Sequence, residues 1–229
     1  MVTLTAPGAL RTVRARRQFR SEAALPRAQP SEPRRTSTLP ALHLLGWATG
    51  AMFFFYAWIL RVAPSVMIDE MMRDLAVGGA VIGNLSALYF FGYAGMQVPV
   101  GMLIDRFGPR RLMTAAALGC VGGCAIFALS GGIAGVAVGR LVIGGAAAFS
   151  LVGAMAVAGL WFPAQRFALL SGLAMMMGML GGVVGQAPFR LLVEALDWRG
   201  AVLALAVGGI ALAAAAWTTV RDRPREAKA

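Results

Sequence analysis

The sequence predicts an all-α membrane protein with six transmembrane helices. Three observations support this prediction: an apolar composition, six long apolar segments, and basic charge that gathers on one side of those segments. Of the 229 residues, 59% are hydrophobic and 14% are charged, and the mean hydropathy is +0.71. A soluble domain carries about 25% charged residues, and a disordered chain is far less hydrophobic. The composition therefore excludes both classes for most of the chain.

The N-terminal region, residues 1–40, differs from everything that follows it. It contains eight Arg, two Glu and five of the 11 Pro residues. A segment of this composition cannot bury enough apolar surface to fold, so we expect a disordered cytoplasmic tail. An organellar targeting peptide is the alternative, because such peptides are also rich in Arg and poor in acidic residues.

Six apolar segments follow this tail, and each is long enough to cross a bilayer, which takes about 20 residues as a helix. Pro64 marks a kink or an end of the first segment, charged residues separate the second from the third, and Gly131 and Gly132 separate the third from the fourth. The expected spans are 41–67, 80–103, 112–131, 133–160, 167–192 and 200–219. They form one domain over 41–219, followed by a polar tail at 220–229.

Charge sorts between the two sides of these spans. Sixteen of the 21 basic residues lie in the two tails and in the connections after spans 2 and 4. The opposite side carries Arg73, Arg199 and five acidic residues, which are Asp69, Glu70, Asp74, Glu194 and Asp197. Because cytoplasmic loops carry the excess of Lys and Arg, we expect both termini in the cytoplasm, in a bacterial inner or plasma membrane. This distribution explains the net charge of +11 without nucleic-acid binding.

The most specific motif lies between spans 2 and 3, where residues 101–111 read GMLIDRFGPRR. Gly108 permits a tight turn. Asp105, near a membrane surface, needs a cation or a helix N-terminus as its partner. A basic loop placed only by the charge rule is the alternative.

This segment resembles the loop motif of the major facilitator superfamily, roughly G-x-L-x-D-R-x-G-R-R. Pro109 departs from the usual basic residue, and the matching positions are Gly101, Leu103, Asp105, Arg106, Gly108, Arg110 and Arg111. Residues 140–144 are similar to the helix-4 signature of the family, and residues 161–166 to its next cytoplasmic loop. Residues 61–67 also resemble bacterial relatives of the lysosomal dipeptide transporter branch.

The resemblance implies that the chain is the N-terminal six-helix half of a transporter, built from two inverted three-helix repeats. A second six-helix half, or a homodimer partner, would then complete the substrate cavity. It also implies a gating role for the motif that includes Gly101, Asp105, Arg106, Gly108, Arg110 and Arg111. In the family, the Asp of this motif engages the other half when the cytoplasmic side is closed.

Charged residues inside a span are costly, which makes them functional candidates. At about 1.5 Å per residue, Arg61 in span 1 and Arg140 in span 4 both fall in the outer half of the bilayer. Helices 1 and 4 line the central cavity in the family, so we expect both side chains to face it. The alternatives are snorkelling for Arg61 and pairing with backbone carbonyls for Arg140. Arg190 is expected to snorkel at the outer end of span 5.

Polar stripes on spans 1 and 2 extend this candidate site. At about 100° per residue, Trp58 shares a stripe with Arg61, and Tyr93 shares one with Gln97. A polar stripe faces a cavity or another helix rather than lipid. The expected substrate contacts are therefore Arg61, Arg140, Tyr93, Gln97 and Trp58, with interhelical hydrogen bonds as the alternative on span 2.

The predicted spans contain these arginines but no Asp or Glu. Arg side chains suit a carboxylate or a phosphate. We therefore expect a secondary transporter half that moves a small anionic or zwitterionic organic solute by alternating access. The alternative is a non-transporting membrane scaffold or a truncated transporter relic. The sequence contains one His and two Cys, so no metal site is expected. We also expect no cofactor, and no nucleophile–base pair of the kind that an enzyme uses.

Overall fold

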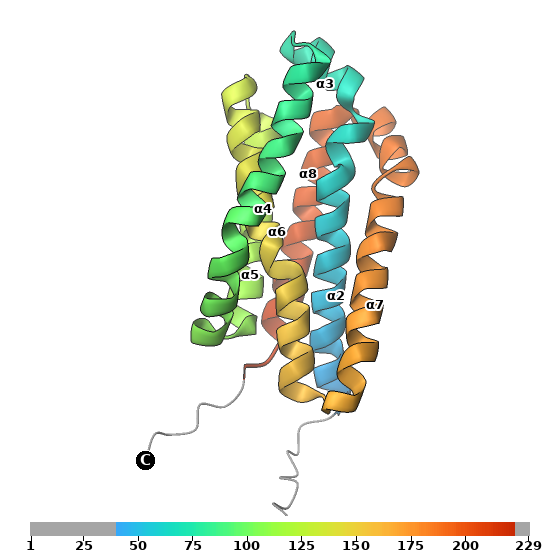
Figure 1. Ribbon diagram of the computed structural model, residues 1–229. Helices are drawn as coiled ribbons and strands as arrows, with labels where there is room; N and C mark the ends of the chain where they lie inside the picture. Colours follow the sequence, from blue (N-terminus) through green and yellow to red (C-terminus); the bar gives the residue numbers. More distant parts are fainter. Residues whose placement is uncertain (1–39, 223–229) are drawn as a thin grey trace, which may run out of the picture. The chain divides into compact units, whose positions relative to one another are not determined.

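The computed structural model describes residues 40–222 (Figure 1). In this range the chain forms helices, six of which are long and apolar enough to cross a membrane. They are α2 (Pro40–Val62), continued by a 3-10 helix η1 (Ala63–Val66), α4 (Gly79–Phe107), α5 (Pro109–Leu129), α6 (Ile133–Trp161), α7 (Ala164–Val184) and α8 (Ala187–Thr219). The predicted all-α membrane fold is confirmed. The tail predicted at 1–40 and most of that at 220–229 lie outside the described residues.

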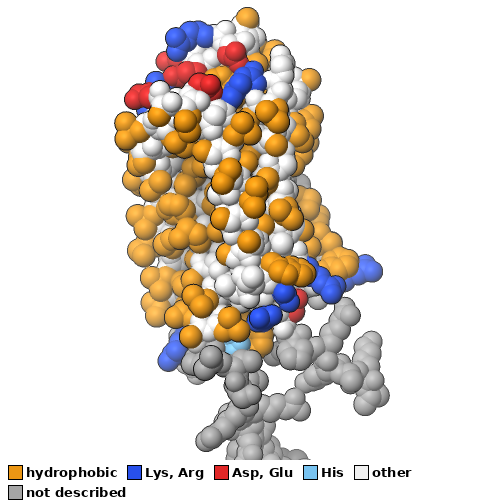
Figure 2. All heavy atoms as spheres, turned by 180° about the vertical axis from the view of Figure 1, so that it is seen from behind, with side chains coloured by type: hydrophobic (Ala, Val, Ile, Leu, Met, Phe, Trp, Pro, Cys, Tyr) orange, Lys and Arg blue, Asp and Glu red, His pale blue; other side chains and the backbone are white. Residues whose placement is uncertain are grey.

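The helices pack as a bundle in which α2 and α6 hold central positions. α6 contacts α4, α5 and α2, whereas α2 contacts α6, α7 and α8. α8 also packs along α5. Figure 2 shows apolar side chains over the length of the bundle, with charged ones gathered at its two ends. This pattern matches a bundle whose middle lies in hydrocarbon and whose ends meet water.

Glycines allow several of these helices to approach closely. A Cβ atom added at Gly181 of α7 would collide with the carbonyl oxygen of Phe55 in α2. A Cβ at Gly144 of α6 would collide with the carbonyl oxygen of Tyr89 in α4. Small residues at such contacts are what holds membrane helices together, because lipid provides no hydrophobic driving force between them.

The boundary between the fifth and sixth helices differs from the prediction. α7 ends at Val184, and Pro188 lies in the first turn of α8, where its missing N–H is not needed. α8 then breaks at Asp197, whose φ is 60° and ψ is 175°. The Asp197 carboxylate accepts hydrogen bonds from the backbone N–H groups of Arg199 at 2.6 Å and Gly200 at 3.0 Å. Asp197 thus caps the part of α8 that follows it, and residues 187–196 form a separate segment.

Arg190 lies on this separate segment of α8, so its predicted placement in span 5 is wrong. Its Nη1 is 2.8 Å from Glu70 Oε1 and also donates to the carbonyl oxygen of Val66 at 2.8 Å. Its Nε donates to Glu194 Oε1 at 3.0 Å. Two carboxylates and a backbone carbonyl at this end of the bundle therefore bind the guanidinium of Arg190.

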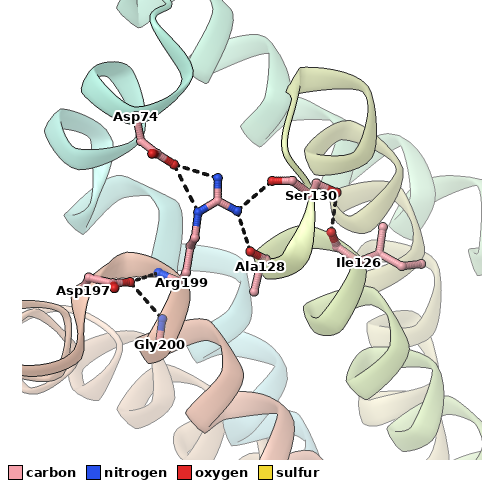
Figure 3. A network of polar contacts seen from close by, with 7 residues as sticks. All are labelled: Asp74, Ile126, Ala128, Ser130, Asp197, Arg199 and Gly200. Atoms are coloured by element: carbon pink, nitrogen blue, oxygen red, sulfur yellow. Dashed lines mark hydrogen bonds and ion pairs between the residues drawn. The ribbon is translucent and has the colours of Figure 1, made fainter.

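The connection between α2 and α4 contains a short helix, α3 (Ile68–Leu75), which is bonded to α8 through Asp74 and Arg199 (Figure 3). Arg199 donates from Nε and Nη2 to Asp74 Oδ2 at 3.1 and 2.7 Å. Its Nη1 donates to the carbonyl oxygens of Ala128 at 2.6 Å and Ser130 at 2.7 Å. These carbonyls lie at the C-terminus of α5, where the last turn has no intrahelical donors. One side chain therefore closes α5 and holds α3 against α8.

Candidate functional site

Pro64 determines how the first transmembrane helix ends. In an α-helix the carbonyl of residue 60 accepts the N–H of residue 64, and proline has no N–H. α2 accordingly stops at Val62, and the chain continues as the 3-10 helix η1. The carbonyl oxygen of Leu60, which is buried, loses its helical partner.

Arg140 of α6 supplies the missing donor. Its Nη1 donates to the carbonyl oxygen of Leu60 at 2.8 Å, and its Nη2 to that of Arg61 at 3.4 Å. The Arg140 residue is only 2% exposed, and its Cζ lies 5.0 Å from the centre of the Tyr89 ring. The structure thus shows the backbone pairing that the sequence analysis gave as the alternative for this arginine.

A small cavity adjoins this contact. It has a volume of about 10 Å³ and is lined by Leu60, Pro64, Arg140 and seven apolar or sulfur-containing side chains. That volume holds one water molecule at most. Nε of Arg140 has no hydrogen-bond partner within the described residues.

Arg61 has quite different surroundings, although it follows Leu60 directly. Its guanidinium carbon lies 4.6 Å from the centre of the Trp58 ring and 4.7 Å from that of Phe90 on α4. The residue is half-buried, and within the described chain its side chain makes no hydrogen bond or ion pair. Aromatic faces attract the cation, whereas guanidinium hydrogen bonds lie in the plane of the group. The two rings therefore hold Arg61 and leave its N–H donors unoccupied.

Tyr89 connects Tyr93 to these arginines. The Tyr89 ring stacks on that of Tyr93, with centres 6.1 Å apart and planes at 15°, and it also lies beneath Arg140. Gln97 is exposed one turn further along α4, and it makes no hydrogen bond with any described residue. The structure therefore brings together Trp58, Arg61, Arg140 and Tyr93, and among the described residues no hydrogen bond joins Gln97 to them.

The sequence analysis did not identify Phe90. An apolar residue on a membrane helix looks like any lipid-facing side chain, and Phe90 is indeed 47% exposed. Phe90 of α4 lies level with Arg61 of α2, and its ring contacts the guanidinium. How two helices align along their lengths is known only from the packed structure.

The loop motif between α4 and α5 is held by a residue from the far end of the chain. Gly108 has φ +84°, and a Cβ atom there would collide with the carboxylate of Asp222. Asp222 Oδ1 accepts a hydrogen bond from the backbone N–H of Arg110 at 3.0 Å. Asp222 therefore caps the N-terminus of α5. Gly108, the residue that precedes this helix, has no side chain with which to do so.

Arg110 strengthens the same attachment. Its Nε donates to the carbonyl oxygen of Trp217 at 2.8 Å, and its guanidinium lies 4.2 Å from the centre of the Trp217 ring. Trp161, the last residue of α6, donates from its indole nitrogen to the carbonyl oxygen of Arg221 at 3.1 Å. The segment after α8 thus joins the ends of α5 and α6. Asp222 escaped the sequence analysis because it lies in an apparently featureless polar tail.

The remaining charged residues of the motif face outward. Asp105 and Arg111 are exposed, and Arg106 packs over the ring of Phe107 at 5.3 Å. The expected cation or helix N-terminus beside Asp105 is absent among the described residues, because Asp222 occupies the N-terminus of α5. Exposure to water removes the need for such a partner.

Comparison with known proteins identifies the family. The model of the Major Facilitator Superfamily matches residues 43–229. The chain belongs to the Major Facilitator Superfamily. The resemblance predicted from the loop motif is confirmed, and the six apolar helices make this superfamily member an integral membrane protein.

Two curated relatives within the superfamily carry names that mention a substrate. The "Probable sulfoacetate transporter SauU" of Cupriavidus necator is 24% identical over 167 residues, which cover 73% of this chain and 38% of that protein. A "Putative tartrate transporter" of Agrobacterium vitis is 26% identical over 185 residues, which cover 77% of this chain and 41% of that protein.

A solved structure supports the superfamily fold. A bacterial homologue of the human lysosomal transporter Spinster, in an inward-facing and unoccupied conformation, matches with a TM-score of 0.72. The sequence identity is 17%, and the match covers 81% of this chain and 44% of that one. At this identity the likeness shows the fold alone. The chain spans less than half the length of each relative described.

Proposed function

We propose that the chain forms one six-helix half of a secondary transporter. It moves a small anionic or zwitterionic organic solute across the membrane by alternating access. The observation that carries the proposal is the geometry of Arg61, whose guanidinium lies over two aromatic rings and makes no ion pair within the described residues. A guanidinium without an ion-pair or hydrogen-bond partner inside a membrane costs free energy. A bound anion would lower this cost by accepting hydrogen bonds from its N–H groups.

The names of the relatives favour this class of solute. Sulfoacetate and tartrate are both small organic acids, and both names belong to the relatives rather than to this chain. An acid group offers two oxygens to the fork of a guanidinium. In this proposal Arg61 binds the acid group, Arg140 contacts the backbone behind Arg61, and the surrounding wall includes Trp58, Tyr93 and Gln97.

The other parts of the chain have roles consistent with transport. A second six-helix half, or a second copy of this chain, completes the site, and the motif at 101–111 governs opening at the cytoplasmic end. Both termini lie in the cytoplasm, which places the basic connections on that side. No Asp or Glu lies in the middle of the six described helices. Coupling to protons therefore requires an acid from the second half, or the process is uniport or exchange.

Binding of the two named acids tests the proposal. Sulfoacetate and tartrate are titrated calorimetrically into the full chain in detergent, and Arg61→Gln is compared with Arg166→Gln. Arg166 is an exposed arginine in the first turn of α7, which makes it a matched control. We expect Arg61→Gln to weaken binding at least about tenfold and Arg166→Gln to leave it unchanged. If the unmodified chain binds neither acid, the scaffold interpretation replaces the transporter one.

A further inference from the structure

We propose that the two membrane arginines have different roles. Arg140 is a positioning residue that satisfies the carbonyl released by Pro64, and Arg61 alone offers its donors to the solute. This half therefore binds the solute through a single acid group. The last statement rests on the proposed function, whereas the role of Arg140 stands on the contacts alone.

Burial separates Arg140 from any solute. Its side chain is enclosed, with two of its nitrogens already bonded to backbone carbonyls. The cavity beside it, at about 10 Å³, is far too small for an organic acid. A solute can reach Arg61, which is half-buried, without displacing any hydrogen bond of its side chain.

The carbonyls that Arg140 holds belong to Leu60 and to Arg61 itself. Arg140 therefore fixes the stretch of backbone from which the Arg61 side chain departs, and it fixes that stretch against α6. The Leu60 carbonyl needs Arg140 because residue 64 is a proline. In an uninterrupted helix, the backbone N–H of residue 64 would donate to this carbonyl. Without the guanidinium, the buried carbonyl of Leu60 loses this donor, which is costly.

Phe90 is a second positioning residue for Arg61. The ring centres of Phe90 and Trp58 lie 4.7 and 4.6 Å from the guanidinium carbon, and the N–H donors of the group lie in its own plane. A carboxylate or a sulfonate can bind the edge of this plane through two oxygens. The guanidinium of Arg61 thus binds one acid group. If the solute has a second acid group, residues other than Arg61 and Arg140 must bind it.

A stability cycle between Arg140 and Pro64 tests the first role. Thermal unfolding of the full chain in detergent is measured for Arg140→Gln, Pro64→Ala and the double variant. Arg140→Gln should lower Tm by about 4–10 °C, because buried carbonyls lose their donor. In the Pro64→Ala background, where a backbone N–H is restored, the drop should be no more than about half as large.

Equal drops in both backgrounds, or no drop in either, would overturn the positioning role. Arg140→Lys serves in the same cycle if Arg140→Gln does not fold, because it keeps the charge but cannot reach both carbonyls in fork geometry. This cycle needs no ligand, so its outcome is independent of the proposed function.

Binding of sulfoacetate tests the division of roles. Phe90→Leu should weaken binding about three- to thirtyfold, as expected for the loss of a cation–π contact, and Phe90→Tyr should restore it. The double variant of Arg140 and Pro64 should bind within about threefold of Pro64→Ala, because its helix no longer needs the guanidinium. If that double variant loses binding as fully as Arg61→Gln, Arg140 is a direct ligand and the inference is wrong. If the unmodified chain binds no sulfoacetate or tartrate, the proposed function fails, while the stability cycle still decides the role of Arg140.

Discussion

Replacing Arg199 should destabilise the bundle far more than replacing its ionic partner Asp74. Arg199→Ala removes the hydrogen bonds to the part-buried carbonyls of Ala128 and Ser130, each worth about 1.5–3 kcal/mol for a charged donor. The ion pair adds only about 0.2–1 kcal/mol, because the two side chains are 31% and 44% exposed. We expect a loss of about 3–5 kcal/mol for Arg199→Ala and less than about 1 kcal/mol for Asp74→Ala.

The chain carries its own reporter for this experiment. Its two cysteines, Cys120 and Cys124, are both buried in α5. A thiol-reactive dye therefore reports unfolding of the full chain in detergent without any added label. For a chain of this size Tm should fall by about 2–4 °C per kcal/mol. Arg73→Ala is the control, because Arg73 is 76% exposed and its pair with Glu70 measures 4.0 Å.

The comparison between the two variants can refute this reasoning. If Asp74→Ala lowers Tm as much as Arg199→Ala, the ion pair rather than the hydrogen bonds to the C-terminus of α5 stabilises this end of the bundle. Salt gives a second check, because screening weakens exposed pairs. Added salt should reduce the small effect of Asp74→Ala and leave most of the Arg199→Ala effect intact.

Three further substitutions test other contacts. Asp222→Ala should cost about 1 kcal/mol and speed amide hydrogen exchange in the first turn of α5, because it removes the cap; unchanged exchange at Arg110 would argue against capping. Gly108→Ala should cost about 1–3 kcal/mol in thermal unfolding, through its positive φ and its collision with Asp222; a neutral result would mean that the turn relaxes. Gly181→Ala should separate α7 from α2 and reduce cross-linking between cysteines introduced on the two helices, whereas Gly172→Ala, which meets open space, should not.

Much of the fold could be predicted because hydropathy and charge act over long segments. Spans 1 to 4 differ from the observed helices by at most a few residues at each end. The boundary between spans 5 and 6 was predicted wrongly, because it depends on local backbone chemistry. Pro188 starts a helix within the predicted span 5, and Asp197 caps a helix within the predicted connection between spans 5 and 6.

The candidate site could be predicted only where charge marked it. Arg61 and Arg140 are conspicuous in apolar helices, and the substrate roles expected for both remain predictions. Their contrasting surroundings depend on which carbonyl Pro64 releases and which residue of α4 lies level with Arg61. The residue of α4 that lies level with Arg61 is Phe90. The periodicity of a single sequence does not show how two helices align along their lengths.

The unequal lengths of the helices have a consequence for the lipid around them. α5 and α7 have 21 residues each, about 32 Å, which suits a hydrocarbon core of about 30 Å. α4 and α6 have 29 residues each, about 44 Å, so they tilt or extend into the headgroups. Phe90 lies on α4 and Arg140 on α6. We expect acyl-chain length, by changing the tilt of these two helices, to alter the spacing of the groups that contact the two arginines, so that bilayer thickness becomes a variable of the proposed site.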